Sequence, residues 1–78
     1  MHGKQLALSA LREARGWTRA ELARRAHMTA GDVGKIEAGR LVPYESQLKK
    51  LARALGTPTA DARRLLDEID GHGRHDAA

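Results

Sequence analysis

The 78-residue chain has no cysteine and no phenylalanine, and Trp17 and Tyr44 are its only aromatic residues. The absence of cysteine excludes disulfide bonds and thiolate zinc sites. No apolar run approaches the roughly 20 residues that cross a bilayer, and charged residues follow the first apolar residues too closely for a secretory signal. A domain of this size with so few aromatic side chains has little means of enclosing a substrate. We therefore expect a cytoplasmic, non-enzymatic domain with no membrane partner and no cofactor.

Charge is distributed unevenly along the sequence, whose formal net charge is +4. Residues 1–26 contain six lysine and arginine residues against two acidic residues, whereas residues 57–78 contain five acidic residues against three arginines. A basic first part suggests a polyanionic partner. The alternative is an ordinary solvated surface in which arginine is used freely, and charge alone does not separate the two.

Hydrophobic periodicity predicts five helices joined by short links, with no strand signal. The expected segments are Lys4–Arg15 ending at Gly16, Thr18 to about Ala26, Thr29 to a stop at Gly39, Glu45–Leu55 ending at Gly56, and a fifth helix that starts at Thr57-Pro58 and carries Leu65, Leu66 and Ile69. Residues 1–70 are thus predicted to form one all-α domain, and residues 71–78 a disordered tail. Glycines on both sides of His72 argue against a helix that would let His72 and His75 bind a metal, so no metal is expected.

The segment from Thr18 to Gly39 predicts two short helices joined by a tight turn. Thr18 is followed three residues later by Glu21, the spacing of a capping box, and Thr29 is a second candidate N-cap. Only His27 and Met28 remain between the two helices, which is too short a link for an antiparallel pair, so the helices must cross steeply. This geometry is a helix-turn-helix, in which the second helix projects outward.

Several segments combine into a longer pattern: LREARGWTRAELARRAHMT, then Val33-x-x-Ile36-Glu37-x-Gly39, then Pro43, then LARALG at residues 51–56. Together they resemble the lambda-repressor-like, Cro/C1-type (XRE) helix-turn-helix family, from about Leu6 to Gly56. The resemblance implies a five-helix domain that binds double-stranded DNA. It also implies a transcriptional regulator that usually acts as a dimer.

The resemblance further implies an ion pair between Arg12 and Glu37. In this family the arginine after the first-helix leucine often pairs with the glutamate near the end of the recognition helix. We expect a half-buried brace that holds the recognition helix against the first helix. The alternative is two solvated surface charges. Removing one partner costs about 3–5 kcal/mol if the pair is buried and about 0–1 kcal/mol if it is exposed.

In this family the start of the recognition helix lies in the major groove. The positions that would face the bases here are Thr29, Ala30, Gly31, Gly34 and Lys35. Thr29 and Lys35 can form hydrogen bonds and Ala30 can contact a thymine methyl group, but glycine has no side chain with which to read a base. Two explanations for the glycines stay open: close approach of the helix backbone to DNA, or weak direct readout that relies on DNA shape or on a partner.

Phosphate contacts are expected from residues around the recognition helix. Arg19 begins the preceding helix, whose N-terminus meets the DNA backbone in this family, and Thr18 caps that helix. Arg40 follows the recognition helix, and Lys49 on the next helix flanks the same strand. Such contacts position a protein without reading sequence, and they make affinity fall with salt.

The expected fifth helix carries more apolar side chains than a small core needs. Leu65, Leu66 and Ile69 either complete the core of the monomer or form an isologous dimer interface, and we favour the dimer. The sequence thus predicts a small dimeric DNA-binding regulator, such as a repressor or autoregulator. The alternative is a protein-interaction module, antitoxin-like or regulator-binding, that keeps the fold but reads bases weakly.

Overall fold

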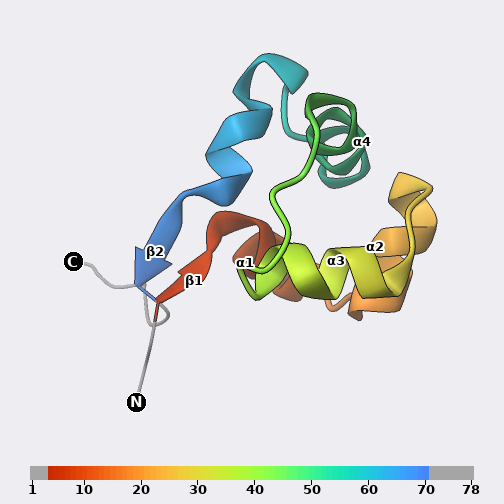
Figure 1. The fold of residues 1–78 in the computed structure, drawn as a ribbon, viewed down its shortest axis with the longest axis horizontal. Helices are drawn as coiled ribbons and strands as arrows, with labels where there is room; N and C mark the ends of the chain where they lie inside the picture. Colours follow the sequence, from red (N-terminus) through yellow and green to blue (C-terminus); the bar gives the residue numbers. More distant parts are fainter. Residues whose placement is uncertain (1–3, 71–78) are drawn as a thin grey trace.

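The computed structural model describes residues 4–70, which form five short helical segments and a two-stranded ribbon (Figure 1). In chain order the elements are β1 (Lys4–Leu6), α1 (Ala7–Ala14), α2 (Arg19–Ala26), α3 (Ala30–Glu37), α4 (Glu45–Leu55), the 3-10 helix η1 (Thr59–Leu66) and β2 (Glu68–Asp70). The five helical segments confirm the predicted fold class, a mainly α-helical domain. The β ribbon and the α2–α3 turn lie at opposite ends of the molecule in Figure 1.

Two threonines fix the starts of α2 and α3. Oγ1 of Thr18 accepts a hydrogen bond from the backbone N–H of Glu21 at 3.0 Å, and Oγ1 of Thr29 accepts one from the N–H of Asp32 at 3.0 Å. Each bond satisfies a backbone donor that has no partner within the helix, which makes both residues N-caps. The two helices therefore begin where the sequence predicts.

One hydrophobic core joins all five helical segments. Its members, each at most 4% exposed, are Leu8, Leu22, Ala23, Ala26, Val33, Ile36, Leu48, Leu51, Ala52, Leu55, Ala62 and Leu65. Trp17 is half-buried against this core, and its ring lies 4.3 Å from the guanidinium carbon of Arg25. Full burial of one leucine side chain is favourable by about 1.5–3 kcal/mol, so the core supplies the main driving force for folding.

The chain has a β ribbon that the sequence analysis did not predict. β1 pairs with β2 in antiparallel register, with Lys4 opposite Asp70 and Leu6 opposite Glu68. Helix α1 consequently begins at Ala7, three residues later than expected, because residues 4–6 are extended. Three-residue strands are too short to show the alternation that identifies a strand in a sequence. Their pairing also joins the two ends of the described chain, which no local pattern reveals.

The expected fifth helix is a 3-10 helix that ends at Leu66, and Ile69 lies beyond it in β2. Pro58 rather than Thr57 occupies the N-cap position, without a side-chain hydrogen bond. Leu65 and Ile69 are four residues apart, so one continuous helix would place them on the same face. That expectation is wrong, because Ile69 lies outside the helix. Leu65 is 1% exposed in the core, whereas Ile69 is 36% exposed. The physical reason is the pairing of β2 with β1, which extends the backbone after η1.

Within residues 4–70, no helix is long and apolar enough to cross a membrane. The same part of the chain contains no group of three or more His, Asp or Glu residues placed to hold a metal ion. The predicted tail, residues 71–78, lies outside the described residues, and so does its His72–His75 motif.

Candidate nucleic-acid interface

Helices α2 and α3 pack against each other through a turn that His27 makes possible. The backbone of His27 is left-handed, with φ 58° and ψ 47°, and it is the only non-glycine residue with positive φ among residues 4–70. The N–H of Met28 donates to the carbonyl of Ala23 at 2.8 Å and closes the end of α2. Leu22 and Val33 are fully buried, so facing sides of the two helices meet in the core. The opposite side of α3 is left at the surface.

The five positions predicted to face bases lie on this outer side or at its start. Thr29, Ala30, Gly31 and Lys35 are exposed, and Gly34 is half-buried. The Thr29 oxygen accepts the capping hydrogen bond, which leaves its O–H free to donate to another partner. The structure thus brings these positions together on one surface.

The chain's own packing does not require glycine at Gly31 or Gly34. A Cβ atom added to Gly31 would lie 3.9 Å from Oγ1 of Thr29, and one added to Gly34 would lie 3.8 Å from Cδ of Arg19. Both separations are ordinary van der Waals contacts. Neither residue has positive φ, unlike Gly39 at +75°. Glycine nevertheless costs a helix interior about 1 kcal/mol relative to alanine, so its presence here calls for a cause outside the chain's own packing.

Behind α3, the guanidinium of Arg12 binds the carboxylate of Glu37 at two points. Nε of Arg12 donates to Oε2 at 2.8 Å and Nη2 donates to Oε1 at 3.1 Å, while Nη1 donates to the carbonyl of Trp17 at 2.7 Å. The side chains of Arg12 and Glu37 are only 9% and 3% exposed. The pair therefore ties the end of α3 to α1 and to the start of the motif, out of reach of a groove-bound base.

Glu37 stays ionised in this setting. Burial alone would raise its pKa, but the hydrogen bonds from Arg12 and Arg19 more than offset that effect, so the pKa of Glu37 lies below its usual value. In return, the hydrogen bond to Glu37 raises the pKa of Arg12 against the opposing effect of burial. Both groups are thus charged at neutral pH, as the two-point geometry requires.

Arg19 also binds Glu37, and this contact was not predicted from the sequence. Its Nε donates to Oε1 of Glu37 at 2.9 Å, although the Arg19 side chain is 58% exposed. Its Cδ lies beside Gly34. Arg19 and Glu37 are 18 positions apart, a separation that carries no helical spacing to signal the contact.

The other residues predicted to contact phosphates are at the surface. Arg40 and Lys49 are exposed, and neither has an ion-pair partner among residues 4–70. In contrast, Arg24 and Arg25 both bind the carboxylate of Glu21, each at 2.6 Å. Glu21 therefore does not complete the predicted capping box, because its carboxylate is turned to these two arginines. Arg40 after α3 and Lys49 on α4 are thus exposed cations without acidic partners among the described residues.

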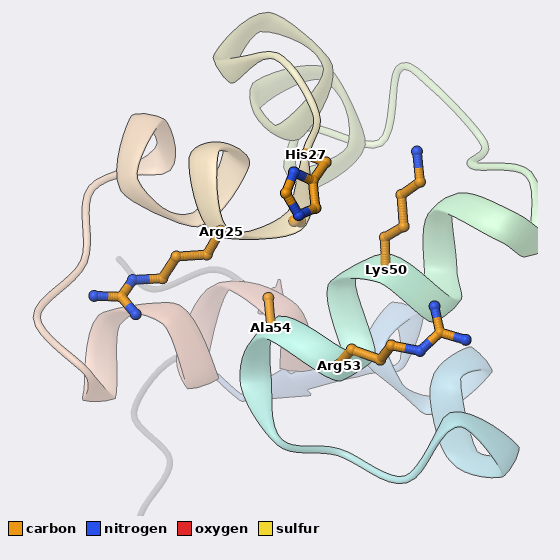
Figure 2. Close-up of a pocket in the computed structure, with 6 residues that line it drawn as sticks. Arg25, His27, Lys50, Arg53 and Ala54 are labelled. Carbon is orange, nitrogen blue, oxygen red and sulfur yellow. The ribbon is translucent and has the colours of Figure 1, made fainter.

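A shallow hollow of about 210 Å³ lies between the α2–α3 turn and α4 (Figure 2). Its lining residues are Arg25, Ala26, His27, Lys50, Arg53 and Ala54. Figure 2 shows the guanidinium of Arg25 pointing away from Lys50 and Arg53. The lining is basic, with Arg25, Lys50 and Arg53, and it offers no carboxylate.

The fold and the exposed α3 agree with comparisons against known proteins. A family model described as a helix-turn-helix domain matches residues 6–66. Over 64 residues the chain is 34% identical to uncharacterized HTH-type transcriptional regulators of Mycobacterium bovis and Mycobacterium tuberculosis. These alignments cover 82% of this chain and 25% of each relative, so the chain spans a quarter of the length of these curated relatives.

Two solved structures have the same arrangement of helices. An HTH_3 family transcriptional regulator from Vibrio cholerae superposes with a TM-score of 0.66 at 27% identity, over 72% of this chain and 32% of that chain. The clp gene regulator ClgR from Corynebacterium glutamicum superposes with a TM-score of 0.65 at 32% identity, over 73% and 61% of the two chains. The chain therefore belongs to the lambda-repressor-like, Cro/C1-type helix-turn-helix family.

Proposed function

We propose that this chain is a sequence-specific DNA-binding domain of a transcriptional regulator, and that α3 reads the major groove. The proposal depends chiefly on one observation. Thr29, Ala30 and Gly31 are exposed at the start of α3, while Val33 and Ile36 on its other side are buried. A helix held in this way can enter a groove that is about 12 Å wide without disturbing the core. The regulators to which the chain is similar support the same role.

Surface charge supports contact with the DNA backbone. Lys35, Arg40 and Lys49 are exposed and lack acidic partners within the described residues, so phosphate groups would not have to displace an existing ion pair. The free backbone N–H groups at the start of α2 favour a bound anion. The hydroxyl of Thr18, the N-cap of that helix, lies beside them. Arg19 begins the same helix and adds a largely exposed guanidinium. These groups fix the position of α3 on a duplex.

The regulator is proposed to act as a dimer that occupies an operator as a repressor or autoregulator. A dimer would place two copies of α3 about one turn of DNA, roughly 34 Å, apart. Leu65 contributes to the monomer core and Leu66 is half-buried against it. Ile69 is the only one of these three residues that the monomer leaves exposed, so it is our candidate for the dimer contact.

A protein-interaction module is the second candidate function. Val42 is 82% exposed and Tyr44 is 77% exposed, on the loop between α3 and α4. Tyr44 thus does not pack inward, and the loop presents two apolar side chains that a partner could cover. Together with Gly31 and Gly34, which read no base through a side chain, this loop favours a regulator that also binds another protein.

A salt titration tests the proposal. The full chain is mixed with a fluorescent duplex of random sequence, and the dissociation constant is measured between low and physiological salt. Contacts to three or four phosphates predict that the logarithm of the association constant falls against the logarithm of salt with a slope of about −3 to −4 per protomer. No binding at the lowest salt would refute DNA binding and favour the protein-interaction module.

A further inference from the structure

Gly34 and Arg19 occupy the same part of the α3 surface. Gly34 is one of the positions predicted to face the bases, and it carries no side chain. The place that its Cβ would take lies 3.8 Å from Cδ of Arg19, so the aliphatic part of Arg19 runs alongside α3 at that position. A side chain from α2 therefore covers the surface that Gly34 leaves bare.

Glu37 fixes the direction of the Arg19 side chain. Nε of Arg19 donates to Oε1 of Glu37 at 2.9 Å, and the same carboxylate is bound by Arg12 at 2.8 and 3.1 Å. Arg12 alone balances the charge of Glu37. The second guanidinium, on Arg19, thus leaves one net positive charge on the trio, and it belongs to the member that is 58% exposed.

The end of the Arg19 guanidinium that carries Nη1 and Nη2 is suited to a ligand with two neighbouring hydrogen-bond acceptors. An arginine carries five N–H donors in a planar fork, and the contact with Glu37 uses the donor on Nε. Nη1 and Nη2 make no hydrogen bond to another side chain or to the backbone within residues 4–70. That end of the fork matches the O6 and N7 acceptors of guanine, the most common specific contact in the major groove. A fork already held in place loses less freedom on binding.

We infer that Arg19, held across Gly34 by Glu37, reads a guanine base in the major groove, in addition to any phosphate contact. Arg19 would then supply the readout that Gly34 lacks, and Glu37 would act as its positioning residue. The Arg19 stem runs past Gly34 at a distance that would leave room for a Cβ atom, so its path does not depend on glycine at this position. This inference rests on the proposed function. A phosphate contact by Arg19 would not depend on the DNA sequence, whereas the inferred contact with a guanine base would.

The test compares base discrimination in Arg19 variants of the full chain. The preferred duplex is first selected from a random pool with the unaltered protein, and each guanine in it is then replaced in turn by 7-deazaguanine or by adenine. Arg19→Lys keeps the charge but lacks the planar fork that binds Glu37 through Nε and leaves Nη1 and Nη2 for the base. We therefore expect discrimination at one G·C pair to fall by roughly 5- to 150-fold. Affinity for an unrelated duplex should change little. Arg24→Lys on the same helix is the matched control, and it should leave discrimination unchanged.

A second comparison tests the positioning role of Glu37. Glu37→Gln removes the charge that holds both arginines, whereas Arg12→Gln weakens the brace but leaves the contact between Glu37 and Arg19. Both variants are expected to be less stable, and both are assayed well below their unfolding temperatures. Only Glu37→Gln should reduce discrimination at the base pair that Arg19 reads.

Four outcomes count against the inference, and the last of them also refutes the proposed function. If Arg19→Lys keeps full discrimination at every pair, or if Arg19→Ala weakens all duplexes equally, Arg19 contacts phosphate only and the inference fails. If Arg12→Gln lowers discrimination as much as Glu37→Gln does, Glu37 has no separate positioning role. If the unaltered protein binds no duplex at low salt, the proposed function fails and the inference fails with it.

Discussion

The guanidinium of Arg12 and the carboxylate of Glu37, 25 positions apart in the sequence, meet in a two-point ion pair at 2.8 and 3.1 Å. The pair is almost completely shielded from water, and it joins α1 to the end of α3. Together with the core residues Val33 and Ile36, it holds α3 against the rest of the domain. The stability of the domain should therefore depend on these two side chains.

Removing one partner of this pair should be costly. Arg12→Ala strands the buried Glu37 carboxylate, and we expect the free energy of unfolding to fall by about 3–5 kcal/mol, measured by urea unfolding of the full chain. Arg63→Ala is the matched control, because the pair between Arg63 and Glu45 is 82% and 56% exposed at its two side chains. That change should cost about 0–1 kcal/mol. Equal losses in the two variants would show that Arg12 and Glu37 act as surface charges.

The stability of the domain should depend on pH through Glu37. Its pKa is lower in the folded chain than in the unfolded chain, because Arg12 and Arg19 favour the carboxylate over the opposing effect of burial. Ionised Glu37 therefore contributes fully above the unfolded pKa of about 4.3, and the contribution is lost as pH falls through the lower folded value. Urea unfolding between pH 3 and pH 7 should show a stability gap between the unaltered chain and Glu37→Gln that narrows below about pH 4. A gap that stays constant over this range would contradict the assignment.

Replacing the two glycines of α3 by alanine should stabilise the isolated domain. Gly31→Ala and Gly34→Ala place a methyl group at ordinary contact distance, and each should raise the free energy of unfolding by up to about 1 kcal/mol. Gly39→Ala serves as the opposite control. The backbone there has φ +75°, so alanine should destabilise the chain.

The same alanine variants separate the two explanations for the glycines. If the α3 backbone approaches DNA closely, Gly31→Ala should weaken duplex binding even though the folded protein is more stable. Fluorescence anisotropy with the preferred duplex measures this directly. Unchanged affinity would instead favour weak direct readout with reliance on DNA shape or a partner.

Sequence reasoning found the elements that depend on local chemistry. The threonine caps and the stop at Gly56 each act within a few residues, so the starts of α2 and α3 and the end of α4 follow from the sequence. The pairing of β1 with β2 could not be predicted in this way. It joins residues 4–6 to residues 68–70 through backbone hydrogen bonds, and three residues on each side carry too little side-chain pattern.

At the candidate site, too, some features were predicted from the sequence, whereas contacts that depend on how the helices cross were not. The family resemblance implied that Thr29 and Lys35 face outward, and both residues are exposed, Thr29 as the N-cap of α3 and Lys35 within it. The contact of Arg19 with Glu37 and Gly34 was missed because it depends on the crossing of α2 over α3. A spacing of 18 residues says nothing about such a crossing. The sequence also led us to expect that the Tyr44 ring packs inward to fill the corner before α4. That expectation is wrong, because Tyr44 is 77% exposed.

The central claim is that α3 lies against a DNA duplex, and an NMR titration of the full chain with its preferred duplex tests it most directly. We predict that the largest amide shift changes fall on residues 29–35 and on the first turn of α2. The amide shifts of residues that line the hollow beside α4, such as Lys50 and Arg53, should change little. Shift changes confined to that hollow, or to the exposed loop at Val42 and Tyr44, with none on α3, would contradict the account.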